Sequence, residues 1–125
     1  DGTQYKGWLL LENEYYYLLP KTGQMQTGWV QVDDKWYYMK PDGRMASEWA
    51  QVDGKYYYLL NGAMVTGWIT LGDKAYYLGG DGGMLTGWQN IDGQIYYLYP
   101  DGHKAVNEVI DTFYVDQDGI WRKPQ

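Results

Sequence analysis

The residues of this sequence that could take part in chemistry are its aromatic rings. The 125-residue chain carries 7 Trp and 15 Tyr, but no Cys and a single His. That histidine, His103, follows Gly102 in a turn and has no partner pattern around it. Acidic residues fall in short polar turns, where they favour tight turns and solubility. We therefore expect no catalysis, no metal site and no cofactor. The aromatic rings are the candidate binding groups.

The tryptophans recur at a nearly constant spacing. Five of them are separated by 21, 20, 19 and 20 residues: Trp8, Trp29, Trp49, Trp68 and Trp88. Seven residues after each Trp an aromatic-rich triplet begins, at Tyr15, Trp36, Tyr56, Ala75 and Ile95. A Gly-containing turn follows each triplet, and two residues after its Gly stands Met25, Met45, Met64, Met84 or Lys104. The chain is therefore an internal repeat.

Each repeat predicts a β-hairpin. The first strand starts at the Trp, a polar turn such as Asp53-Gly54 follows, and the aromatic triplet forms the second strand. A lone hairpin is marginal in water, but stacked hairpins bury a continuous core. We expect an all-β solenoid of stacked hairpin repeats, forming a single module over 1–125. Its parts are a truncated upstream tail (1–5), repeats at 6–26, 27–46, 47–65, 66–85 and 86–105, and a divergent cap (106–125).

Alternation along the strands separates two faces of each hairpin. Counted from the Trp as position 0, positions +1, +3, +8 and +10 share an apolar face, which we expect to be the core face. The Tyr at +8 are therefore expected to be structural. Positions 0, +2, +7 and +9 share the other face, where large rings accompany polar residues. Rings that wall an exposed recess attract a cation with an apolar shell, and quaternary ammonium is the chemical match.

Charge and hydropathy exclude two classes of partner. The net charge is -6, which disfavours nucleic acid. Mean hydropathy is -0.60 and no long apolar run occurs, so no membrane span is expected.

The pattern resembles a known family, the choline-binding (cell-wall-binding) repeats of surface proteins and phage lysins of pneumococci and their relatives. The best match runs from Thr27-Gly28-Trp29 to Lys35-Trp36-Tyr37-Tyr38, followed by Asp42-Gly43 and Met45. The resemblance covers 6–105 well and 106–125 poorly. It implies that choline sits between consecutive hairpins, held by positions 0 and +7 of one repeat and +9 of the next. The implied sets are Trp8, Tyr15 and Tyr38; Trp29, Trp36 and Tyr58; and Trp49, Tyr56 and Tyr77.

Other positions depart from that pattern. Position +7 is Ala75 in the fourth repeat and Ile95 in the fifth. The pairs Trp68 with Tyr97 and Trp88 with Tyr114 therefore lack a wall, and we expect weak or empty sites there. Tyr17 would serve a site with the missing upstream repeat. The resemblance allows a fourth wall from Met25, Met45 or Met64, although methionines at turn ends are more often gap-fillers.

Three functions follow as hypotheses. The first is a non-catalytic module that holds a secreted protein or lysin on the surface of a Gram-positive bacterium, through phosphocholine of teichoic and lipoteichoic acids. The second is a glucan-binding repeat module that stacks sugars on Trp and Tyr. The third is a spacer or self-association module without a ligand, and pairing of two chains through the terminal repeats stays open.

Overall fold

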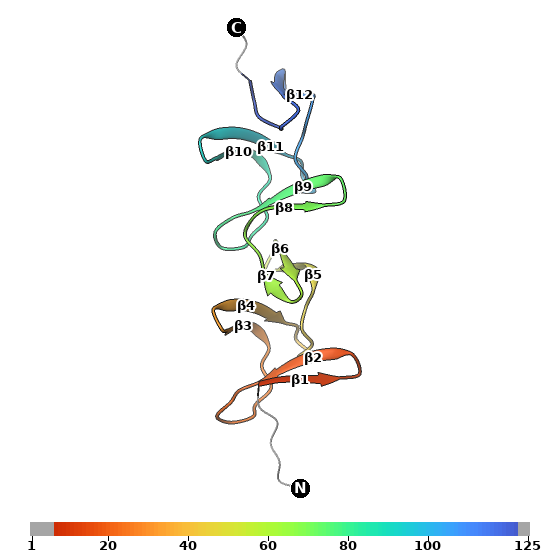
Figure 1. The fold of residues 1–125 in the computed structure, drawn as a ribbon, viewed down its shortest axis with the longest axis vertical. Helices are drawn as coiled ribbons and strands as arrows, with labels where there is room; N and C mark the ends of the chain where they lie inside the picture. The colour runs from red at the N-terminus through yellow and green to blue at the C-terminus, as the bar shows by residue number, and fades with distance from the viewer. Residues whose placement is uncertain (1–6, 123–125) are drawn as a thin grey trace. The chain divides into compact units, whose positions relative to one another are not determined.

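The computed structural model describes residues 7–122, and every regular element within them is a β-strand (Figure 1). The predicted upstream tail, 1–5, lies outside these residues. No helix in the described range is long and apolar enough to cross a bilayer. The strands are β1 (Gly7–Leu11), β2 (Glu14–Leu18), β3 (Gly28–Val32), β4 (Lys35–Met39), β5 (Glu48–Val52), β6 (Lys55–Leu60), β7 (Ala63–Met64), β8 (Gly67–Leu71), β9 (Lys74–Leu78), β10 (Gly87–Ile91), β11 (Gln94–Leu98), β12 (Glu108–Ile110) and β13 (Phe113–Val115).

The predicted hairpins are confirmed, and they share one register. The Trp at position 0 lies directly opposite the Tyr at +9, as Trp8 does opposite Tyr17. The residue at +7 lies opposite position +2, as Tyr15 does opposite Leu10. In the turn of β3–β4 both central residues have positive φ, 51° at Asp33 and 67° at Asp34. That geometry fits the right-handed twist of the two strands and fixes the register.

After each hairpin the chain turns back and pairs with the second strand it has just left. We call these returning segments; they place Met25 opposite Leu18, Met45 opposite Met39, Met84 opposite Leu78, Lys104 opposite Leu98 and Trp121 opposite Val115. In the third repeat the returning segment is β7, where Met64 pairs with Leu59.

The same returning segments join consecutive hairpins. The Met45 amide donates a hydrogen bond of 2.8 Å to the carbonyl of Tyr15, in the preceding hairpin. The Lys104 amide does the same to Ala75 at 2.8 Å, and the Trp121 amide to Ile95 at 2.7 Å. β7 likewise pairs with β4, opposite Tyr37. The backbone at position +7 therefore holds the next repeat, and its side chain takes no part in that bond.

The core is small, and its largest side chains come from one position of the repeat. The fully buried side chains with the largest volumes are Met39, Leu59, Leu78, Leu98 and Val115. The first four are the predicted +10 residues, and Val115 stands in the equivalent place in the last hairpin, because its segment pairs with Trp121. The expected core residue Leu11 differs, since its residue is 53% exposed. No described hairpin precedes β1–β2 to cover that face.

The chain divides into two compact units, residues 1–65 and 66–125. The division coincides with the predicted end of the third repeat at residue 65. Within the first unit, the β1–β2 and β3–β4 hairpins point to different sides (Figure 1). The β8–β9 and β10–β11 hairpins of the second unit do the same.

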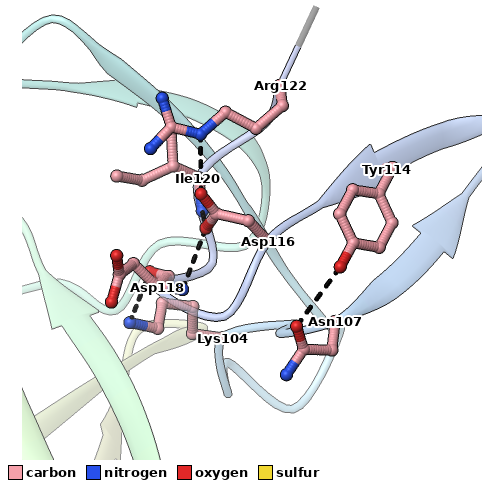
Figure 2. Close-up of polar contacts among 7 residues, drawn as sticks. All are labelled: Lys104, Asn107, Tyr114, Asp116, Asp118, Ile120 and Arg122. Carbon is pink, nitrogen blue, oxygen red and sulfur yellow. Dashed lines mark hydrogen bonds and ion pairs between the residues drawn. The ribbon is translucent and has the colours of Figure 1, made fainter. Parts of the chain in front are cut away.

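The last hairpin, β12–β13, is short and is followed by a polar turn (Figure 2). Asp116 accepts hydrogen bonds from the amides of Asp118 and Ile120, both at 2.9 Å, and from Arg122 Nε at 2.6 Å. The hydrogen bond from Arg122 holds the pKa of the Asp116 carboxyl below its usual range. Within the described residues, these contacts of Asp116 hold the turn that follows the last hairpin.

Replacing Asp116 by Asn should lower the melting temperature of the chain at neutral pH, because the amide pairs poorly with Arg122. Since the folded pKa of Asp116 is depressed, its contribution is present above the unfolded pKa and is lost as the pH falls through the folded value, below about 4. Thermal unfolding followed by circular dichroism from pH 7 to pH 2.5 should show the two proteins converging in acid. A constant difference over that range contradicts this assignment.

Replacing Gly43 by Ala should destabilise the first unit by about 1–3 kcal/mol. Gly43 has φ +91°, and a Cβ there would lie 2.5 Å from Met25 Sδ and 3.2 Å from Tyr16 Cδ2. Urea unfolding measures the change. The matched control is Gly80→Ala, where φ is outside the left-handed region and nothing lies within 4 Å of the added Cβ. Equal stability of the two variants would show that the turn glycine is dispensable.

Candidate functional site

An open recess of about 410 Å³ lies on the first unit beside Trp8. Trp8 and Tyr15 come from the two strands of the first hairpin, and Tyr37 comes from β4 of the next. The ring centroid of Trp8 is 6.3 Å from that of Tyr15 and 4.8 Å from that of Tyr37. The remaining lining residues are Met45, Ser47 and Asn61, so no charged side chain lines the recess.

The rings around Trp8 meet edge to face, with interplanar angles of 87° to Tyr15 and 72° to Tyr37. This arrangement is favourable for aromatic pairs. Trp8 and Tyr15 are 37% and 44% exposed, so their rings remain accessible after packing on each other. The hairpin thus leaves π surface facing solvent, next to a ring supplied by its neighbour.

The third ring of this recess is one residue away from the expected one. Tyr38 packs on Trp29 of its own hairpin, with centroids 5.2 Å apart, whereas Tyr37 contacts Trp8. Alternation explains the difference, because Tyr38 at +9 shares a face with its own Trp and faces away from the preceding hairpin. The ring that contacts Trp8 from the second hairpin is therefore Tyr37, and the part of Tyr38 in a choline site stays a prediction.

The contact between a Trp and the +8 ring of the next hairpin recurs along the chain. Its centroid distances are 4.9 Å for Trp29–Tyr57, 5.0 Å for Trp68–Tyr96 and 6.0 Å for Trp88–Phe113. The +8 residues do lie on the face opposite the Trp, as expected, but that face meets the preceding hairpin's ring. The period-2 pattern separates +8 from +9, but it does not say which of the two faces meets the preceding hairpin.

The other two predicted sets are distributed as follows. Trp29 contacts Tyr57, while Tyr58 packs on Trp49 at 5.1 Å, and Trp36 on β4 is 40% exposed. Trp49 and Tyr56 lie on the β5–β6 hairpin of the first unit. Tyr77 lies on β9 of the second unit and packs on Trp68 at 5.0 Å. The grouping of Trp49, Tyr56 and Tyr77 stays a prediction.

Met45 combines the two roles weighed for the turn methionines. Its side chain lies directly against Gly62, which has no Cβ to obstruct it, and it also lines the Trp8 recess. Met25 lies in the same way against Gly43. The methionine at the Trp8 recess therefore comes from the returning segment of the hairpin that supplies Tyr37.

The two incomplete repeats differ from each other. Beside Trp68 and Ala75, the Lys104 ammonium lies 5.2 Å from the Trp68 centroid and 5.9 Å from that of Tyr96. Beside Trp88, an apolar recess of about 230 Å³ is lined by Trp88, Ile95, Phe113 and Trp121.

The expected partner of Trp88 was Tyr114, and this too differs by one residue. The Tyr114 hydroxyl instead donates to Asn107 Oδ1 at 3.3 Å (Figure 2), while Phe113 contacts Trp88. Trp121 of the cap lies 6.3 Å from Phe113 and supplies a further ring. The recess at Trp88 is thus walled by rings, although its affinity for a ligand stays a prediction.

Polar groups elsewhere make local contacts. His103 stacks on Tyr99 with centroids 4.4 Å apart, and its Nδ1 lies 2.6 Å from Asp101 Oδ1. A hydrogen bond with Glu108 raises the pKa of the Tyr99 hydroxyl to about 12. Among residues 7–122, no group of three or more His, Asp or Glu side chains is placed to hold a metal ion.

Comparison with known proteins bears on these repeats directly. The sequence model of the cell wall binding repeat, of choline-binding type, matches residues 27–45, 47–64, 66–84 and 86–104. No curated protein sequence matches the chain.

Several solved structures are also similar to this chain. Choline binding protein F from Streptococcus pneumoniae is 40% identical with a TM-score of 0.91, over 95% of this chain and 41% of that one. CbpJ from Streptococcus pneumoniae TIGR4 is 38% identical with a TM-score of 0.73, over 94% and 48%. The Cpl-1 endolysin, complexed with a peptidoglycan analogue, is 27% identical with a TM-score of 0.64, over 99% and 40%. The chain therefore spans less than half the length of each.

These matches cover more than half of the sequence and coincide with the hairpins described above. Repeats of this kind are binding units that attach proteins to the cell wall of Gram-positive bacteria. The chain belongs to the family of choline-binding, cell wall binding repeat proteins.

Proposed function

We propose that the chain holds its parent protein on the cell surface by binding the choline headgroups of teichoic and lipoteichoic acids. The observation that carries this proposal is the Trp8 recess. Rings from two consecutive hairpins, Trp8 and Tyr15 with Tyr37, line an open hollow of about 410 Å³ that contains no charged side chain. Trp29, with Trp36 and Tyr57, is proposed as a second site of the same kind.

The chemistry of the lining supports a quaternary ammonium group. Its methyl groups offer no hydrogen-bond donor, so the group gains from ring faces and not from paired polar atoms. Each ring contributes roughly 0.5–2 kcal/mol, depending on desolvation. The net charge of -6 favours the approach of cations. A structure of choline binding protein F in complex with ipratropium, itself a quaternary ammonium compound, points the same way.

Repetition supports a polymeric target. We expect a single recess of this type to bind weakly, and a millimolar dissociation constant corresponds to about -4 kcal/mol. Recesses repeated along one chain can engage several headgroups of one polymer, which raises the apparent affinity by roughly 10²–10⁴-fold when the spacing matches. Repeats carrying many weak sites therefore suit a repetitive polymer such as a phosphocholine-bearing teichoic acid.

A glucan is the competing ligand. Sugars stack on Trp and Tyr but also need hydrogen-bond partners for their hydroxyl groups. The Trp8 recess offers two polar lining residues, Ser47 and Asn61. This small number favours a ligand with an apolar cationic end.

Replacing Tyr15 by Ala tests the proposal with little effect on folding. The Tyr15 carbonyl, and not its ring, accepts the bond from Met45, and Ala75 occupies the same position in β9. A choline titration followed by the Trp8 indole NMR signal should show about 2- to 30-fold weaker binding, the loss of one ring's contribution. The unfolding midpoint in urea should hardly change.

The matched control is Tyr114→Ala, because Tyr114 is 45% exposed against 44% for Tyr15 but does not line the Trp8 recess. Choline affinity at Trp8 should stay unchanged in this control. No response of the wild-type Trp8 signal by tens of millimolar choline overturns the proposal. Retention on dextran, without retention on a choline-type anion-exchange resin, assigns the recess to a glucan.

Pairing of two chains through the terminal repeats is a separate proposal. Its support is the apolar surface of the last hairpin, where Val109, Phe113 and Tyr114 are 65%, 45% and 45% exposed. Sedimentation velocity should show concentration-dependent dimers that Val109→Asp weakens. A monomer at every concentration contradicts it.

A further inference from the structure

Lys104 takes the place of methionine in the returning segment of the fifth repeat. Its amide donates to the Ala75 carbonyl at 2.8 Å, as the Met45 amide does to Tyr15 at 2.8 Å. It also pairs with Leu98 across the segment, as Met45 pairs with Met39. The backbones of Lys104 and Met45 are therefore equivalent.

The side chain of Lys104 also follows the methionine path. A Cβ added to Gly119 would lie 2.6 Å from Lys104 Cδ and 2.9 Å from Cε. Met45 lies against Gly62 in the same way, and Met84 against Gly102. An unbranched stem resting on a turn glycine is thus common to all three, and lysine adds an ammonium group at its end.

That ammonium reaches two aromatic rings. Lys104 Nζ lies 5.2 Å from the centroid of Trp68 and 5.9 Å from that of Tyr96. These rings are 5.0 Å apart and hold the positions that Trp8 and Tyr37 hold in the first unit. Nζ also donates a 2.9 Å hydrogen bond to the Asp118 carbonyl, within the cap (Figure 2). The two distances and the hydrogen bond to the Asp118 carbonyl together place the ammonium group of Lys104 over the rings.

We propose that Lys104 is a built-in cation that fills the aromatic site of the fourth repeat, so that this repeat takes no quaternary ammonium ligand. The site has no ring at +7, because Ala75 stands there. The ammonium group of Lys104 lies in the space beside Trp68. A soluble ligand must displace a tethered group that is present at high effective concentration. The closure to ligand rests on the proposed function, whereas the seating of Lys104 does not.

The neighbouring repeat shows that this closure is local. The Trp88 recess carries Trp121 at the place of Lys104 and is an apolar hollow of about 230 Å³. Both repeats lack an aromatic residue at +7, yet only the fourth, of these two, holds an ammonium over its rings. The residue of the returning segment therefore decides whether the recess is filled or open.

A reciprocal exchange tests the proposal. Lys104→Met combined with Ala75→Tyr should open the fourth repeat, and Met45→Lys should close the Trp8 recess. Choline titration of the full chain, followed by the indole NMR signals of Trp8 and Trp68, reports each site. In the double variant the Trp68 signal should saturate with an affinity within about tenfold of the wild-type Trp8 site; Met45→Lys should weaken binding at Trp8 by about tenfold or more. Lys74→Met is the charge-matched control and should leave Trp68 unresponsive.

A second measurement needs no ligand. Ring currents should shift the ε-CH₂ protons of Lys104 upfield relative to those of Lys74, and Trp68→Leu should remove that shift. Unshifted Lys104 protons, or a wild-type Trp68 signal that titrates as tightly as in the double variant, overturn the proposal. If choline moves no indole signal in any variant, the proposed function fails, and the Lys104 shift alone decides the seating of the cation.

Discussion

The structure depends on one backbone interaction, the hydrogen bond from a returning segment to the +7 carbonyl of the preceding hairpin, which joins Met45 to Tyr15, Lys104 to Ala75 and Trp121 to Ile95. A two-stranded hairpin buries too little to be stable alone. Met45 bonded to Tyr15, and Lys104 bonded to Ala75, each tie a hairpin to its neighbour at the point where their faces meet. The bond also carries the side chain of the returning segment to the edge of the preceding hairpin's rings. The contact that joins two hairpins therefore also brings together the residues that line the recess between them.

Strand content and register followed from the sequence because both are local properties. Alternation, polar turns and the glycine positions are all set within about twenty residues, and the hairpins form where they predict. The burial of the +10 side chains followed from the same alternation. Among the residues expected in the core, Leu11 at position +3 is the exception, since its burial depends on a neighbour and not on its own hairpin.

The ring that contacts Trp8 from the second hairpin could not be predicted from the sequence. The sequence separates +8 from +9 but does not say which face of a hairpin meets the preceding one. The family resemblance placed Tyr38 beside Trp8, whereas the stacking places Tyr37 there. Likewise, Lys104 was visible as a substitution for methionine, but the destination of its ammonium depends on Gly119 in the cap. Trp121 stands two residues after Gly119, as the turn methionines stand after their glycines, but only the fold brings it to the Trp88 recess.

At position +7 the backbone carbonyl and the side chain have separate roles, and this separation has an evolutionary consequence. Because the carbonyl there carries the linkage, the side chain can be exchanged from Tyr15 to Ala75 or Ile95 without altering the scaffold. Each repeat can therefore gain or lose its ligand site independently of the others. Substitutions in one repeat at a time can therefore adjust how strongly the chain binds a surface and how its sites are spaced.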